Sequence, residues 1–167
     1  GHEMSHGFDD QGRNYDKEGN LVNWWSKADD ENFKARTQIL VDWFNGIEVI
    51  KGTFANGKFT LGENIADNGG VNISFVAMQK AIKDGQVDGG EMDGYSAAER
   101  FFISYAQVWA GNVRDEEIVH LTKEDPHSLG RWRVNATLPH INAFAETYKL
   151  KEGNKMYLAP EKRALIW

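Results

Sequence analysis

Two histidines stand four residues apart at the start of the sequence, in the stretch GHEMSHGFDD. Residues four apart share one face of a helix, so His2 and His6 can direct two imidazoles at one metal ion. Glu3 is rotated off that face, which suits a general base acting on a metal-bound water and not a ligand. The alternative interpretation is a surface helix end that carries these residue types without a metal.

A catalytic zinc site takes three protein ligands, so a third one is needed. The candidates are the many carboxylates and His120, His127 and His140. No histidine follows His6 closely and no Met-turn follows later, which excludes a metzincin. The segment GENIAD is the better source, because Glu63 and Asp67 lie one helical turn apart, so one carboxylate can bind the metal while the other accepts the N–H of a ligating imidazole. Taken alone, Glu63 would be an ordinary acidic helix start.

The composition excludes several classes of function. The chain of 167 residues has no cysteine, so any metal must be bound by His, Asp or Glu. A formal net charge of −6 with mixed signs argues against nucleic-acid binding, which needs clustered Lys and Arg. No apolar run approaches the length of a membrane span, and no signal peptide is visible. We therefore expect no nucleic-acid partner and no membrane contact from this segment.

The elements that must position these residues are mainly helices. Ser26 and Ser96 are each followed three residues later by an acid, which predicts two helix starts. The first of these helices is expected to bury Phe33, Thr37, Leu40, Val41 and Phe44 and to end at Gly46. Further helices are predicted at 61–82, 97–111, 115–122 and 141–148. The small or acidic face of the 61–82 helix lets another helix approach closely, and Asn56-Gly57 predicts a small β-hairpin.

These blocks resemble the C-terminal part of the neprilysin family of zinc endopeptidases, which includes the endothelin-converting enzymes and the bacterial oligopeptidases O. The matching stretches run in family order: HEMSHGFDDQGRNYDKEG, LVNWW, TLGENIADNGG, FFISYAQVWAG, DPHSLGRWRVNATL and the terminal Trp167. The resemblance implies that residues 1–167 are a gluzincin-type catalytic domain fragment, mainly α with one small β-hairpin. It also implies that the N-terminal part of the enzyme is absent.

The resemblance implies a zinc site with one ion and assigns catalytic roles. The implied zinc ligands are His2, His6 and Glu63, and the implied catalytic residues are Glu3, Asp67, Asp125 and His127. Glu3 would act as base and proton shuttle, and Asp67 would brace a ligand. His127, oriented by Asp125, would stabilise the oxyanion of the intermediate. From the residues alone, His127 would be an exposed turn residue.

The resemblance also implies substrate-binding residues. Arg133 would bind a main-chain carbonyl of the peptide, whereas the residues alone suggest a surface ion pair. Val108 and Trp109 would line the apolar pocket for the residue after the scissile bond, whereas the residues alone suggest helix core. Asp9 and Asp10 match the family block and are expected at most to brace the ligand helix. His120 and His140 have no match and are expected to be structural or on the surface.

The sequence therefore predicts a zinc endopeptidase that cuts oligopeptides on the amino side of hydrophobic residues. A second hypothesis is a catalytically silent metal-binding fragment, because the substrate-binding strand of the family and the missing N-terminal part of the enzyme, an expected partner, are not in the chain. A third is a helical interaction module. Ala164 stands where animal members have a cysteine, which favours a bacterial source. We expect an extracytoplasmic location, although bacterial relatives also include cytoplasmic enzymes.

Overall fold

The computed structural model describes residues 1–166, so the terminal Trp167 of the family pattern lies outside the described residues. Its α-helices are α1 (His2–Ser5), α2 (Lys27–Asn45), α3 (Leu61–Lys83), α4 (Ala97–Val108), α5 (Asp115–Glu124), α6 (Gly130–Asn135) and α7 (Asn142–Thr147). Two strands, β1 (Glu48–Ile50) and β2 (Thr53–Phe54), form an antiparallel hairpin between α2 and α3. Short 3-10 helices cover His6–Phe8, Gly12–Asn14, Leu138–His140 and Pro160–Lys162. The predicted mainly α fold with one small hairpin is confirmed.

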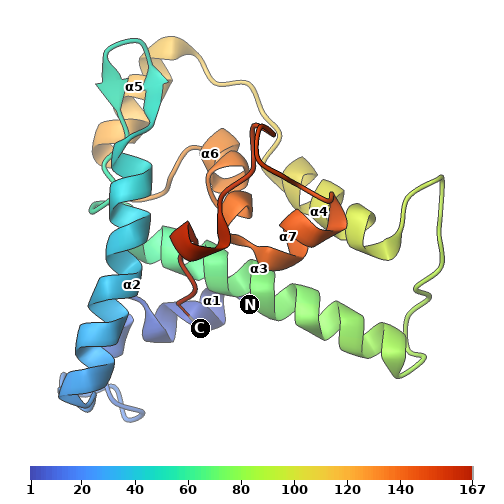
Figure 1. The fold of residues 1–167 in the computed structure, drawn as a ribbon. Coiled ribbons are helices and arrows are strands. Elements are labelled where there is room, and N and C mark those ends of the chain that lie inside the picture. The colour runs from blue at the N-terminus through green and yellow to red at the C-terminus, as the bar shows by residue number, and fades with distance from the viewer. Residues whose placement is uncertain (167) are drawn as a thin grey trace.

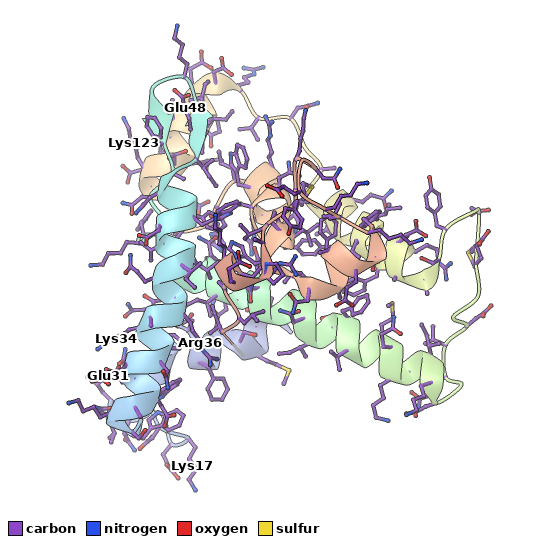
Figure 2. All side chains as sticks on the ribbon, in the orientation of Figure 1. Lys17, Glu31, Lys34, Arg36, Glu48 and Lys123 are labelled. Carbon is purple, nitrogen blue, oxygen red and sulfur yellow. The ribbon has the colours of Figure 1, made fainter. Side chains whose placement is uncertain are left out.

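The two predicted serine caps begin the helices that they were expected to begin. The Ser26 hydroxyl accepts the backbone N–H of Asp29 at the start of α2, which ends before Gly46. Ser96 and Glu99 form a reciprocal capping box at the start of α4. The five residues predicted to form the inner face of α2 are all buried, namely Phe33, Thr37, Leu40, Val41 and Phe44. Glu31 and Lys34 lie on its outer side, pointing away from the other helices (Figure 2), while Arg36 donates to the carbonyl of Ile166.

Helix α3 is the central element, with α2 crossing one end of it and α4, α6 and α7 stacked along it (Figure 1). Its first three turns are buried because two hydrophobic clusters meet on them. Leu61 and Ile65 belong to the cluster built with α2, and Val71 belongs to the cluster built with α4 and α7. The part of α3 that carries the GENIAD motif is thus held from both sides.

The position predicted for the hairpin was wrong. The chain reverses at Gly52, whose φ of 80° suits glycine, and not at Asn56-Gly57. Asn56 instead accepts the Phe59 N–H with its side chain and the Thr60 N–H with its carbonyl, just before α3. A Cβ on Gly57 would lie 2.2 Å from the carbonyl oxygen of Val41. Asn-Gly here serves a close approach to α2, a use that the dipeptide alone does not distinguish from a hairpin turn.

No helix within residues 1–166 is both long enough and apolar enough to cross a membrane.

Candidate metal centre

Three ligand-type side chains converge, namely His2 on α1, His6 at the start of the following 3-10 helix and Glu63 on α3. His2 Nε2 lies 3.1 Å from His6 Nε2 and 3.2 Å from Glu63 Oε2. His6 Nε2 lies 3.4 Å from Glu63 Oε1. Among the described residues, this is the one group of three or more His, Asp or Glu residues arranged to hold a metal ion. The structure therefore joins the HEMSH motif to the GENIAD motif, 57 residues further on.

The spacing of this triad fits zinc. Tetrahedral ligand atoms at 2.0–2.1 Å from an ion are roughly 3.3–3.4 Å apart, close to the three observed separations. Two imidazoles and one carboxylate are also a donor set that zinc accepts in sites with an open fourth position. Without a cation, two ring nitrogens and a carboxylate would have little reason to converge. The residues present thus fit the metal that the sequence predicts.

Helix α1 reaches this position because glycines let its backbone touch α3. A Cβ on Gly70 would lie 2.7 Å from the backbone nitrogen of His2, and a Cβ on Gly1 would lie 2.7 Å from the carbonyl oxygen of Gly70. Helices pack this closely only where side chains are absent at the contact. The predicted role of the small face of α3 is therefore confirmed at Gly70, one turn beyond Asp67.

Each histidine is held by an aspartate on its other ring nitrogen. His2 Nδ1 lies 2.9 Å from Asp67 Oδ1, and His6 Nδ1 lies 2.7 Å from Asp9 Oδ2. Such pairs direct the Nε2 lone pair at the metal by making Nδ1 the N–H donor. The hydrogen bond to Asp67 raises the pKa of His2 above its ordinary value, against the opposing effect of burial. The sequence suggested bracing by Asp9 but not its partner, although the i, i+3 spacing from His6 was a usable signal.

Arg133 is a buried partner of Asp67, so the surface ion pair suggested by the residues alone was wrong. Its side chain donates from Nε at 2.7 Å and from Nη2 at 2.9 Å to the two carboxylate oxygens. Arg133 is 5% exposed, and its guanidinium stacks 4.0 Å above the ring of Trp109. The burial of Arg133 acts to lower its pKa, but Asp67 raises it overall. Nη1 takes no part in these contacts.

His127 and Asp125 lie together at the exposed side of Glu63. His127 Nε2 lies 3.4 Å from Glu63 Oε1, and its Nδ1 lies 2.6 Å from Asp125 Oδ1. Burial acts to raise the pKa of Asp125, but hydrogen bonds from the backbone and ring of His127 lower it overall. Asp125 Oδ1 contacts His127 twice, through the backbone N–H and through ring Nδ1. The structure thus brings His127 and Asp125, both predicted site residues, next to Glu63.

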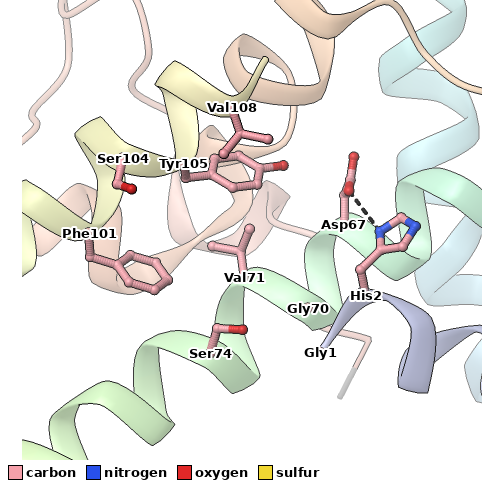
Figure 3. A pocket seen from close by; sticks show the side chains of 10 residues that line it. All are labelled: Gly1, His2, Asp67, Gly70, Val71, Ser74, Phe101, Ser104, Tyr105 and Val108. Atoms are coloured by element: carbon pink, nitrogen blue, oxygen red, sulfur yellow. Dashed lines mark hydrogen bonds and ion pairs between the residues drawn. The ribbon is translucent and has the colours of Figure 1, made fainter. Parts of the chain in front are cut away.

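Val108 and Trp109 have different environments. Val108 is 71% exposed, which contradicts its reading as helix core, and it lines a cavity of about 420 Å³. The other walls of the cavity include Val71, Phe101, Tyr105 and the ligand His2 (Figure 3). Trp109 does not line this cavity and packs on Arg133 instead. The two residues predicted as one pocket wall therefore face different parts of the site.

The remaining candidates separate clearly. Glu3 is exposed on the single turn between the two ligating histidines, and none of the contacts described above involves it. His120 is exposed on α5, while His140 is fully buried and accepts the backbone N–H of Ala164. Neither contacts the metal centre. This agrees with their assignment as structural or surface residues.

Comparison with known proteins identifies the family. The family model described as peptidase family M13 matches residues 1–164. The chain belongs to peptidase family M13. The resemblance to neprilysins is thereby confirmed.

Individual M13 relatives match over the whole chain. Neprilysin-3 of Drosophila melanogaster is 39% identical over 169 residues, and human neprilysin is 39% identical over 173 residues. These alignments cover 100% of this chain but 21% and 22% of the relatives, so the chain spans about a fifth of their length.

Solved M13 structures share the fold. The zinc metalloprotease Zmp1 of Mycobacterium tuberculosis, in complex with an inhibitor, superposes with a TM-score of 0.95 at 35% identity. PepO of Lactobacillus rhamnosis HN001 superposes with a TM-score of 0.85 at 32% identity. Both comparisons cover 100% of this chain, and 26% and 25% of those chains. The M13 arrangement of helices is thus present in residues 1–166.

Proposed function

We propose that this chain is the catalytic part of a zinc-dependent endopeptidase that hydrolyses oligopeptides. The observation that carries the proposal is the convergence of His2, His6 and Glu63 at separations of 3.1–3.4 Å. One zinc ion would be held there, with Asp67 and Asp9 fixing the two imidazoles. Membership of peptidase family M13 supports the reaction class. The solved relatives titled as zinc metalloproteases support the identity of the metal.

Bound zinc would supply a Lewis acid that polarises the scissile carbonyl and lowers the pKa of a coordinated water. Glu3 lies on the same turn as both histidines and is exposed to solvent, so its carboxylate can accept the proton of the attacking water. The same carboxyl group then returns the proton to the leaving amine. His127, oriented by Asp125, donates a hydrogen bond to the oxygen on which negative charge develops.

Substrate binding would use Arg133 and the cavity beside His2. Nη1 of Arg133 would donate to a main-chain carbonyl, while Asp67 and Trp109 hold the rest of the guanidinium. The apolar cavity walls at Val71, Phe101 and Val108 support a preference for a hydrophobic residue after the scissile bond. Trp109 acts on this side through Arg133 and not as a wall of that cavity. The partner of the chain would be a peptide.

Replacing Glu3 separates catalysis from metal binding. Glu3→Gln keeps the shape of the side chain and all ligands, so we expect one bound zinc per chain and a loss of peptidase turnover of at least about 100-fold. Glu63→Ala should lose both zinc and turnover. Metal content by mass spectrometry and cleavage of a fluorogenic peptide measure the two effects. Glu116→Gln, an exposed glutamate in the first turn of α5, is the matched control and should change neither.

Three results would contradict this proposal. Full activity of Glu3→Gln would exclude it as the base, and activity that survives a chelator would exclude the metal. Zinc binding without turnover in the unchanged chain would favour the silent metal-binding hypothesis. The bacterial source and the extracytoplasmic location stay predictions, to be tested by locating the parent protein in fractionated cells.

A further inference from the structure

A buried chain of polar side chains links α3 to the segment that carries His127. Asn64, 1% exposed, accepts the hydroxyl of Ser128 at 2.8 Å with Oδ1 and donates to the hydroxyl of Thr60 at 2.9 Å with Nδ2. The Thr60 hydroxyl in turn donates to the carbonyl of Asn56 at 3.1 Å. Thr60 and Ser128 are themselves buried.

The direction of these hydrogen bonds fixes the orientation of the amide. Because the proton of Thr60 Oγ1 is used on the carbonyl of Asn56, that oxygen can only accept from Asn64. The NH2 group of Asn64 must therefore face Thr60, and its carbonyl must face Ser128. A buried amide with both ends satisfied resists rotation, since a flip would leave polar groups without partners.

The link stands next to catalytic candidates at both ends. Asn64 follows the predicted metal ligand Glu63, and Ser128 follows His127. Residues 125–129 lie between the end of α5 and the start of α6, so no helical hydrogen bonds within the segment hold His127 in place. His127 itself contacts α3 through Glu63, whose Oε1 lies 3.4 Å from its Nε2 and belongs to the predicted ligand set.

We propose that Asn64 and Ser128 are positioning residues that hold the His127 imidazole at a fixed distance from Glu63 and the predicted metal centre. The proposal rests on the proposed function, because it assigns His127 a task during peptide hydrolysis. Its physical basis is the buried hydrogen bond from Ser128, which follows His127, to Asn64, which follows Glu63. A loop that was not tied to the ligand helix would place His127 correctly only part of the time, and displacements of about 1 Å can lower turnover by about 100-fold.

The test uses Ser128→Ala, which removes the hydroxyl and little else. Without metal or substrate, we expect the backbone order parameters of residues 127 and 128, measured by 15N relaxation, to fall from about 0.85 toward about 0.6. In the zinc-loaded chain, we expect kcat to fall by about 10- to 100-fold with little change in KM or in zinc affinity. Ser128→Thr, which keeps the hydroxyl, should restore most of kcat.

The control is Thr37→Val, which deletes an equally buried hydroxyl that donates to the Lys34 carbonyl on α2. It should leave the order parameters of residues 127 and 128 and kcat unchanged. Unchanged order parameters in Ser128→Ala would overturn the positioning role whatever the activity, because that measurement needs neither metal nor peptide. A loss of kcat equal in Ser128→Ala and Thr37→Val would overturn it as well. Absence of zinc binding in the unchanged chain would instead contradict the proposed function alone.

Discussion

Asp67 is the residue on which most of the centre depends. Its carboxylate is 3% exposed and receives three hydrogen bonds, from Nδ1 of His2 and from Nε and Nη2 of Arg133. Arg133 brings a positive charge against this buried carboxylate, and the contact between Asp67 and Nδ1 of His2 orients the imidazole. Arg133, which binds Asp67 and not a metal, thus contributes to the charge around the predicted metal site and to the orientation of His2.

Replacing Asp67 should weaken metal binding without removing a ligand. Asp67→Asn keeps the size of the side chain but loses the charge that orients His2 and pairs with Arg133. We expect zinc affinity to fall by about 10- to 100-fold, measured by competition with a chromophoric chelator. Asp115→Asn, exposed in the first turn of α5, is the control and should bind zinc like the unchanged chain. Equal affinity in both variants would show that Asp67 does not support the ligand.

At this scale the sequence predicted the convergence of His2, His6 and Glu63 better than the contacts around them. The i, i+4 spacing of His2 and His6 is a local pattern that a helix converts directly into proximity. Glu63 was a candidate because it lies one turn from Asp67 in GENIAD, and the resemblance to the neprilysin family implied it as a ligand. The bidentate pair of Arg133 and Asp67 could not be read in this way, since 66 residues separate the partners. Nothing local distinguishes a buried arginine from an exposed one.

At the scale of elements, α1 packs directly against α3. The two backbones meet at Gly70, where a Cβ would lie 2.7 Å from the backbone nitrogen of His2. The geometry of the two histidines is therefore a property of the α1–α3 contact.

Adding one carbon atom at that contact should move the ligands. Gly70→Ala places a Cβ where 2.7 Å separates it from the backbone nitrogen of His2, so α1 must shift. We expect a loss of about 1–3 kcal/mol in the free energy of unfolding and weaker zinc binding, measured by urea titration and chelator competition. Gly111→Ala, where a Cβ meets open space, should change neither quantity. Zinc affinity unaffected in Gly70→Ala would mean that α1 is positioned by other contacts.

Helix starts were predictable, and the hairpin turn was not. Ser26 and Ser96 act within four residues of themselves, so their effect is visible in the sequence. The Asn56-Gly57 pair suits a hairpin turn and an approach to a helix start equally well, and the choice depends on α2, which lies far from it in the pattern. The short helix α6 was likewise not foreseen, because its six residues follow a proline-broken turn.

At the scale of the whole molecule, the C-terminal segment closes over the core through His140. This histidine is 0% exposed, accepts the Ala164 N–H at 3.0 Å and lies edge-on to the ring of Trp43. Burial lowers its pKa to about 4 from the ordinary value of 6.5, with a smaller contribution from Arg163. Between about pH 4 and pH 6.5, His140 is therefore mostly neutral in the folded chain and mostly protonated in the unfolded chain.

The pH dependence of stability follows from this difference. Between pH 6.5 and about 4 the unfolded chain binds one more proton at His140 than the folded chain, so the free energy of unfolding falls as the pH falls. Between pH 7 and pH 5 this amounts to about 2 kcal/mol. In urea unfolding, the free energy of unfolding of His140→Asn should decrease by about 2 kcal/mol less between pH 7 and pH 5 than that of the unchanged chain. The variant His120→Asn, at an exposed histidine, should show the same decrease as the unchanged chain. Parallel pH curves for the unchanged chain and His140→Asn would contradict the assignment.

Helix α3 has a further consequence for how this centre can change. Glu63, Asn64, Asp67 and Gly70 lie within about two turns, and they contact the two histidines, Ser128, His2 and α1 respectively. Each residue added to an α-helix rotates everything after it by roughly 100°. A one-residue insertion between Glu63 and Gly70 would therefore break several of these relations at once, where a substitution would break one. Substitutions can thus change the contacts of the predicted metal centre one at a time, whereas an insertion or deletion in this part of α3 would change several together.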